Sequence, residues 1–367
     1  MVMPLDTKYT LIGSPCSLYT GKLRSYLRYK AIPFDETLST QSCYKSVIIP
    51  RTGVRYIPVL VTPEDEVWQD TTVIIDKLES RFPNNPVATP DAVTNFLAEL
   101  LHCYGDEWLV IPAMHYRWSI EENRRFAYGE FGFTAVPDAT SEEQLQVGMQ
   151  LAERFAGALP VLGVTPQTIP AIEQSYLELL SDLNACLTQS DFIFGNTPTL
   201  ADFGLYGPLY AHLGRDPYSK RLMDEKAPAV SAWIQSMAFS SPKDTTVTAL
   251  NDSGLITPII ARMADEMGDV IIQTLEQVAE FAATGHAEPV PRTVGSLSFS
   301  IGDISGQRKT FPFLQWKWQR VQACYGQLAD QDKAAVDRLL APLGLLPAIQ
   351  AKVEAPLVRR DNQLWFA

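Results

Sequence analysis

Long apolar runs are missing from this chain of 367 residues. The longest are short pieces such as residues 57–61, whereas a membrane-spanning helix needs about 20 consecutive apolar residues. The first residues also lack the charged and then apolar segments of a secretory signal. We therefore expect a cytoplasmic protein that does not insert into a membrane.

Cysteine, histidine and positive charge are scarce as well. The chain has four histidines, none in HxxxH spacing, and its cysteines are too scattered for a disulfide framework or a CxxC zinc site: Cys16, Cys43, Cys103, Cys186 and Cys324. We expect no metal. Lysine and arginine number 30 against 42 aspartates and glutamates, and the resulting net charge of −12 argues against nucleic acid as a partner.

What the chain does contain is an average globular composition, with 46% hydrophobic and 20% charged residues. Its length predicts two or three domains. In the first part, strand and helix signals alternate in the order β-α-β-α-β-β-α. Strands are expected at residues 9–12, 32–34, 56–61 and 66–68, and helices at 18–30, more weakly at 40–53, and at 70–79.

After residue 83 the pattern becomes helical, with helices expected at 91–118, 141–158, 170–188, 200–213 and 228–238. A third stretch follows, with a helix near 255–284, an alternating strand at 297–301 and a helix at 314–328 whose aromatic stripe we assign to the core. We expect an α/β domain over residues 1–85, an all-α domain over 90–242, and a mostly helical extension with a short β segment over 243–367, packed on the body.

The densest chemical signal is the segment from Gly13 to Arg24, between the first strand and the first helix. Ser14, Cys16 and Ser17 lie at the helix start, where unpaired N–H groups and the helix dipole stabilise an anion. A cysteine there can acquire a lowered thiol pKa, and a serine can donate a hydrogen bond to a ligand thiolate. An N-cap serine beside a small apolar cysteine explains the segment equally well.

A second signal is a proline inside the strand at residues 56–61. Pro58 cannot donate a hydrogen bond to a neighbouring strand, so it needs an edge or a special geometry. A cis peptide between Ile57 and Pro58 would turn the backbone groups of Ile57 outwards for an extended ligand. The alternative is an edge strand with a trans proline.

A third signal is Asp70-Thr71, which opens the last helix of the first domain. Capping alone explains both residues. A helix N-terminus also binds a carboxylate, and Asp70 could hold an ammonium group beside it.

Together, in this order, the three segments resemble the glutathione transferase superfamily. Ser17 precedes basic residues by five and seven positions, as the catalytic residue of that family does, whereas Cys16 is one residue out of register. The Ile57-Pro58 run looks like the family's cis-proline segment, and Asp70-Thr71 looks like its acidic residue and serine. Thr199 and Asp202 are similar to the family's helix-capping box, which is structural.

The resemblance implies a thioredoxin-like domain followed by an all-α domain, with glutathione as co-substrate and a small hydrophobic electrophile as second substrate. Ile57 and Pro58 would contact the cysteinyl part of glutathione, and Asp70 and Thr71 its γ-glutamyl end. Ser17 would lower the thiol pKa, although Ser14 and Tyr19 crowd the same position. The second substrate would contact four aromatic residues: Tyr104, Trp108, His115 and Tyr116. The alternative is that these four residues form the core between the domains.

Three alternatives to glutathione transfer stay open. One is a lyase or dehalogenase that uses glutathione as cofactor. If Cys16 faces the ligand, the chemistry becomes thiol transfer or deglutathionylation. A non-catalytic binding or assembly protein could also use this two-domain body. Residues 119–170 are enlarged and residues 243–367 lie beyond the family pattern, which bears on whether the chain forms the family's homodimer.

Overall fold

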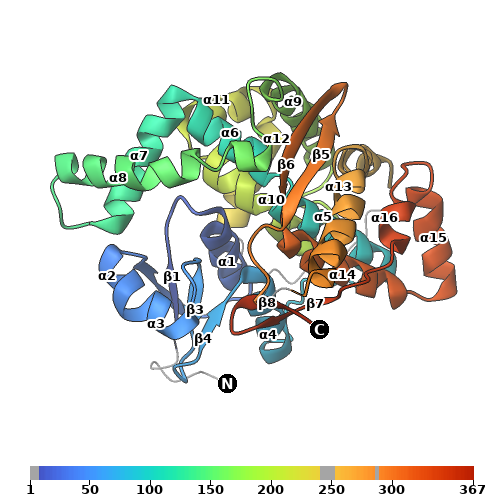
Figure 1. Ribbon diagram of the computed structural model, residues 1–367, viewed down its shortest axis with the longest axis horizontal. Coiled ribbons are helices and arrows are strands. Elements are labelled where there is room, and N and C mark those ends of the chain that lie inside the picture. The colour runs from blue at the N-terminus through green and yellow to red at the C-terminus, as the bar shows by residue number, and fades with distance from the viewer. Residues whose placement is uncertain (1–7, 240–252, 286–288) are drawn as a thin grey trace.

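A four-stranded mixed sheet organises the first part of the computed structural model, which describes residues 8–239, 253–285 and 289–367 (Figure 1). The strands lie in the order β2-β1-β3-β4, with β1 parallel to β2 and the other two pairs antiparallel. They are β1 (Tyr9–Gly13), β2 (Phe34–Leu38), β3 (Val59–Val61) and β4 (Val67–Gln69), and the helices between and after them are α1 (Leu18–Tyr29), α2 (Gln41–Cys43), η1 (Tyr44–Ile48), α3 (Ile49–Thr52) and α4 (Thr71–Arg81). The predicted thioredoxin-like order is confirmed.

Two strand boundaries differ from the sequence prediction because of proline. The second strand runs over residues 34–38 rather than 32–34, and the third begins at Val59 rather than at residue 56. Pro33 and Pro58 have no N–H to give to a neighbouring strand. The ladder therefore starts one residue after each proline, although the Pro33 carbonyl still accepts from the Tyr9 amide (3.0 Å).

The second part is helical. Its elements are α5 (Ala92–Glu107), α6 (Val110–Ser119), α7 (Glu121–Ala135), α8 (Ser141–Ala156), η2 (Pro160–Leu162), α9 (Ile169–Gln189), α10 (Leu200–Pro208), η3 (Leu209–Leu213), α11 (Pro217–Lys226) and α12 (Pro228–Ala238). The single helix expected at 91–118 is two helices that break at Trp108 and Leu109. The helices α7 and α11 were not predicted.

The long α7–α8 hairpin depends on two glycines. A Cβ atom on Gly132 would lie 1.8 Å from the carbonyl oxygen of Gln144, and one on Gly148 would lie 1.8 Å from that of Tyr128. Only glycine lets the two helix backbones approach this closely. The hairpin reaches over the side of the sheet where α2 and α3 lie (Figure 1).

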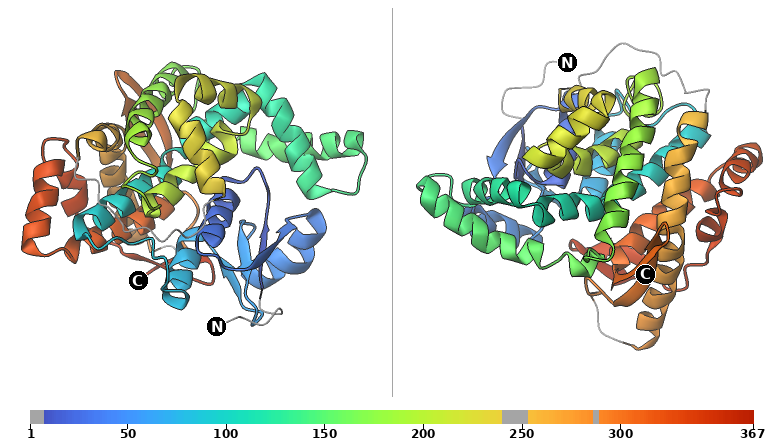
Figure 2. Two further views of the ribbon diagram at one scale, coloured as in Figure 1. Left: turned by 180° about the vertical axis from the view of Figure 1, so that it is seen from behind. Right: turned by 90° about the horizontal axis from the view of Figure 1, so that it is seen from above.

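The third part lies at the opposite end of the molecule from this hairpin (Figure 2). The expected domain boundary at residue 242 falls outside the described residues. The elements after it are η4 (Ser253–Leu255), α13 (Thr257–Ala283), β5 (Gly295–Ile301), β6 (Ile304–Thr310), α14 (Pro312–Gly326), α15 (Asp330–Leu340), α16 (Leu346–Gln350), β7 (Leu357–Arg360) and β8 (Gln363–Phe366). Two separate hairpins, β5–β6 and β7–β8, stand among these helices.

One large apolar cluster joins all three parts of the chain, so the extension shares a core with the body. The aromatic stripe of α14 belongs to this cluster, as predicted, through Leu314, Trp318, Val321 and Tyr325. Among the described helices, none combines the length and the apolar character required to cross a membrane.

The stabilising role of the capping box can be tested at Asp202, in the first turn of α10. Its buried carboxylate accepts hydrogen bonds from the Thr199 amide (2.8 Å), the Ile193 amide (3.0 Å) and the Trp233 indole (3.1 Å). Asp202→Ala leaves these donors without a partner, so we expect the free energy of unfolding to fall by about 3 kcal/mol in urea titrations. Asp269→Ala, at an exposed position of α13, is the control and should change it by about 0.5 kcal/mol at most.

Candidate functional site

Three segments leave the sheet at the same end. In the register of the strands, Ile12 pairs with Val59, and Val59 pairs with Gln69. Neighbouring strands lie about 4.8 Å apart, so these three positions form one row roughly 10 Å wide. The turn that leads to Ser17, the Ile57–Pro58 peptide and the Asp70-Thr71 pair therefore meet at one edge.

The half-buried Ser17 forms the N-cap of α1. Its Oγ accepts a hydrogen bond from the Thr20 amide (3.3 Å), which leaves the hydroxyl proton available for a ligand. A guanidinium from the helical part holds the preceding residue, because Arg117 donates to the Cys16 carbonyl (2.9 Å). Asp216 in turn binds Arg117 through two hydrogen bonds of 2.7 Å.

The Cys16 side chain points away from solvent and is only 4% exposed. Its Sγ lies 3.2 Å from the Ser14 Oγ, which lies 3.0 Å from the Thr134 Oγ1 of α7. Burial raises the pKa of the Cys16 thiol, although the Arg117 charge and the Ser14 hydrogen bond oppose the rise. This environment disfavours the thiolate that nucleophilic chemistry requires.

Tyr19, the remaining candidate, uses its phenol as a structural donor. The hydroxyl donates to the Asp106 carbonyl (3.1 Å), and burial, together with the nearby Glu107, Asp106 and Asp70 carboxylates, raises its pKa well above the usual value. Of Ser14, Cys16, Ser17 and Tyr19, Ser17 has the hydroxyl best placed to donate to a ligand.

The peptide between Ile57 and Pro58 is cis, as the family resemblance implies, rather than the trans alternative. Ile57 is half-buried at the end of the row. Within the described part of the chain, its backbone N–H and C=O form no hydrogen bond. Both groups are thus unpaired next to the Ser17 turn.

Asp70 and Thr71 begin α4. Asp70 has a positive φ (76°), and its Oδ1 accepts from the amides of Thr72 (2.9 Å) and Val73 (3.2 Å). Among the described residues, no partner exists for the amide or the hydroxyl of Thr71. Two donors therefore lie unused at a helix N-terminus, the kind of place that binds a carboxylate.

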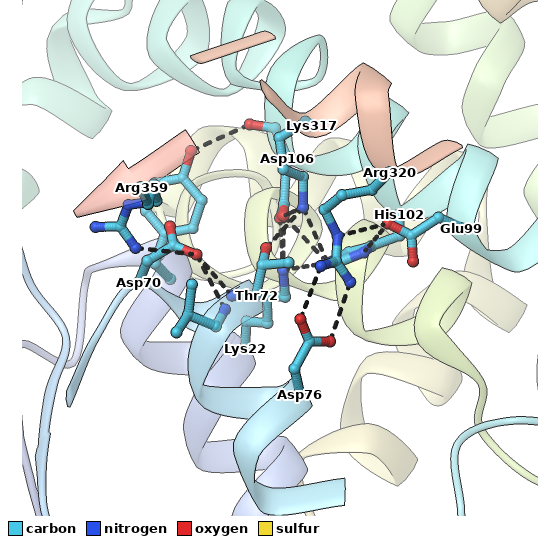
Figure 3. A network of polar contacts seen from close by, with 12 residues as sticks. Lys22, Asp70, Thr72, Asp76, Glu99, His102, Asp106, Lys317, Arg320 and Arg359 are labelled. Carbon is cyan, nitrogen blue, oxygen red and sulfur yellow. Dashed lines mark hydrogen bonds and ion pairs between the residues drawn. The ribbon is translucent and has the colours of Figure 1, made fainter. Parts of the chain in front are cut away.

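A buried charged network lies beside this helix terminus (Figure 3). The Asp106 carboxylate of α5 accepts from Lys22 of α1 (2.7 Å) and from Lys317 of α14 (2.8 Å). Burial alone would raise the Asp106 pKa, but the charges of both lysines and of His102 hold it well below its usual range. Lys317, which is fully buried, also donates to the Thr72 hydroxyl (2.7 Å).

Two arginines of the extension reach the same helix. Arg320 forms a two-pronged ion pair with Asp76 of α4 (2.7 and 3.0 Å). Arg359 of β7 donates to the side-chain oxygen (2.6 Å) and the carbonyl (3.2 Å) of Gln69, and lies 3.9 Å from the Asp70 carboxylate (Figure 3). The extension therefore docks on the start of α4.

The four aromatic residues expected at a second-substrate cleft, Tyr104, Trp108, His115 and Tyr116, are buried. The Trp108 indole donates to Glu266 of α13 (2.7 Å), and the His115 ring lies 2.9 Å from a Glu173 oxygen of α9. Their placement agrees with the alternative that they form core. The His115 contact lies within the helical part, and the Trp108 contact joins that part to the extension.

Four residues that shape the site were not singled out from the sequence: Asp106, Arg117, Lys317 and Arg359. The available signal was charge inside apolar helical patterns, since Asp106 follows a run of buried residues in α5 and Lys317 precedes the buried Trp318. A buried charge requires a partner, but the sequence does not name it.

Two family models match the chain. Residues 11–86 match the glutathione S-transferase N-terminal domain, and residues 166–236 match the glutathione S-transferase C-terminal domain. The chain belongs to the glutathione transferase superfamily. No curated protein sequence matches this superfamily member. In its described residues, no group of three or more His, Cys, Asp or Glu side chains is arranged to hold a metal ion.

Several solved structures are similar to this glutathione transferase relative. The beta-etherase LigF from Sphingobium sp. strain SYK-6 is 16% identical over 63% of this chain and 94% of its own, with a TM-score of 0.45. A GST-like protein from Pseudomonas syringae is 19% identical over 67% and 78%, with a TM-score of 0.43. Rice GST1, in complex with glutathione, is 17% identical over 63% and 86%, with a TM-score of 0.39.

Glu107, at the end of α5, supplies a pH-dependence test. Burial raises its pKa to about 7, with Lys317 opposing the rise and Asp106 and Asp70 adding to it. The folded state then binds a proton more readily than the unfolded state. The contribution of Glu107 to the free energy of unfolding therefore falls as the pH rises from about 4.5 to 7. We expect Glu107→Gln to gain stability relative to the wild type between pH 5 and pH 8 in urea unfolding.

The matched control is Glu121→Gln, at an exposed position of α7. Its difference from the wild type should stay constant over the same pH range. A constant difference for Glu107→Gln as well would show that Glu107 does not titrate in this window.

Proposed function

We propose that this chain binds glutathione in an extended pose across the Ser17, Ile57 and Thr71 segments. The Ile57 backbone would pair with the cysteinyl part, and the Thr71 amide and hydroxyl would hold the γ-glutamyl carboxylate. Asp70 would face the γ-glutamyl amino group. Membership of the glutathione transferase superfamily supports this orientation.

The observation that carries the proposal is the set of unused backbone and hydroxyl groups at one sheet edge. Unpaired groups occur at Ile57 and Thr71, and Ser17 keeps a proton to donate. Polar groups of folded proteins are normally paired when they lie away from water. Such a row, on adjacent strands, is suited to an extended peptide ligand.

In the proposed reaction, the Ser17 hydroxyl donates a hydrogen bond to the glutathione sulfur. This bond and the positive end of the α1 dipole favour the thiolate over the thiol, which lowers the thiol pKa. The Thr20 amide, which donates to Ser17 Oγ, orients the hydroxyl. The thiol proton leaves to solvent, and the thiolate attacks the ring carbon of an aryl halide, so that a carbon–sulfur bond forms, the carbon–halogen bond breaks and halide is released.

Thiol transfer through Cys16 receives less support. Its burial, its raised thiol pKa and its contact with Ser14 all oppose a reactive thiolate. The non-catalytic alternative is favoured by one observation: Thr71 is only 3% exposed, and the residues on either side of it, Asp70 and Thr72, face Arg359 and Lys317 of the extension. Binding and turnover must therefore be measured separately.

Thr71→Val tests the binding part of the proposal. The variant keeps the size of the side chain but loses the hydroxyl, so we expect glutathione affinity measured by calorimetry to fall about tenfold. Thr188→Val, at an exposed position of α9, should bind like the wild type. Absence of glutathione binding to the wild type at millimolar concentration would refute the proposed function.

Ser17→Ala tests the catalytic part. Loss of the hydrogen bond to the thiolate should lower kcat/KM for conjugation of an aryl halide about 100-fold. Cys16→Ala is the matched variant and should change this rate far less, because its thiol is buried. A loss confined to Cys16→Ala, seen with a mixed-disulfide substrate, would instead favour thiol transfer.

Unchanged rates in both variants, with glutathione binding retained, would favour the non-catalytic alternative. The melting temperature of each variant should be compared with the wild type. Ser17→Ala also removes an N-cap, which lowers stability by about 1 kcal/mol without unfolding the chain.

A further inference from the structure

The γ-glutamyl end of the proposed site already holds a positive charge from the same chain. Arg359 of β7 lies 3.9 Å from the Asp70 carboxylate, and its side chain is only 10% exposed. Its guanidinium donates to the side chain and carbonyl of Gln69, directly before Asp70. It therefore lies where a ligand ammonium bound to Asp70 would have to come close.

Arg359 is held in place by its own hairpin. Its guanidinium also donates to the Asn362 carbonyl (3.2 Å) and lies over the Trp316 ring (5.6 Å). Asn362 anchors the turn by donating to the Thr52 carbonyl (3.0 Å). Displacing the arginine would disrupt several contacts at once.

The remaining hydrogen-bonding capacity of Asp70 is also reduced. Its Oδ1 already accepts from the amides of Thr72 and Val73 and faces Arg359. A ligand ammonium beside it would add a second positive charge near one carboxylate, and like charges repel. A ligand carboxylate at Thr71 meets the opposite situation, because Arg359 and the α4 dipole both attract it.

We propose that Arg359 is a specificity-determining residue that discriminates against a free ammonium group at Asp70. The site then favours anionic thiol peptides that lack the γ-glutamyl amino group. This inference rests on the proposed function, since it concerns the same γ-glutamyl end. Through Arg359, the extension thus determines whether the thiol peptide with or without this amino group binds more tightly.

The experiment compares two ligands that differ in one group. Calorimetry measures binding of glutathione and of glutaryl-cysteinyl-glycine, which has the same skeleton without the amino group. We expect the wild type to bind the deaminated peptide more tightly, on the order of tenfold. In Arg359→Gln the ratio of the affinity for the deaminated peptide to that for glutathione should shrink to about one or reverse, because Asp70 becomes available to the ammonium.

Two matched variants separate charge from structure. Arg360→Gln removes the same charge from the exposed neighbouring residue and should keep the wild-type ratio. Arg359→Lys keeps a positive charge but loses the two-pronged contact with Gln69, and should retain most of the discrimination. Melting temperatures of all variants establish that each is folded.

The outcomes are distinguishable. If both ligands bind and Arg359→Gln leaves their ratio unchanged, or weakens both equally, the proposal is overturned while glutathione binding stands. If neither ligand binds the wild type or Arg359→Gln, the proposed function itself fails, and the discrimination fails with it.

Discussion

The buried Asp106 carboxylate is the interaction on which the arrangement of this molecule depends. It lies on α5 and accepts hydrogen bonds from Lys22 of the thioredoxin-like part and Lys317 of the extension. Both ammonium groups are fully buried, so each needs a compensating negative charge. One carboxylate therefore joins all three parts of the chain. Removing it would leave two cations buried beside each other.

This junction places the extension against the proposed glutathione site. Lys317 reaches the Thr72 hydroxyl in the first turn of α4, and Tyr19 beside the Ser17 turn donates to the Asp106 carbonyl. Arg359 then approaches Asp70 from the β7–β8 hairpin. In this superfamily member, residues outside both matched family domains contact the helix that would hold the γ-glutamyl group. The extension is part of the site's surroundings rather than an appendage.

Local signals predicted a large share of the fold. The strand and helix order of residues 9–81 and the capping box at Asp202 follow from neighbouring residues. Those residues left both isomers of the Ile57–Pro58 peptide open, and the family resemblance implied the cis form that the structure has. The α7 helix was missed because its glycines disfavour a helix in isolation. Its contact with α8, made possible by Gly132 and Gly148, stabilises it in the folded chain. The break at Trp108 also depends on packing, since that side chain donates to Glu266 in the extension.

For the candidate site, the sequence by itself determined where Ser17, Ile57 and Thr71 lie on their elements, because caps, turns and proline act within a few residues of the chain. Only the tertiary structure decided that Cys16 is buried, that Asp106 pairs with both Lys22 and Lys317, and that Arg359 faces Asp70. The contact between Arg359 and Gln69 spans 290 positions. Periodicity shows that a charged residue will be buried, but its partner is selected by the packing of distant helices, which no local pattern contains.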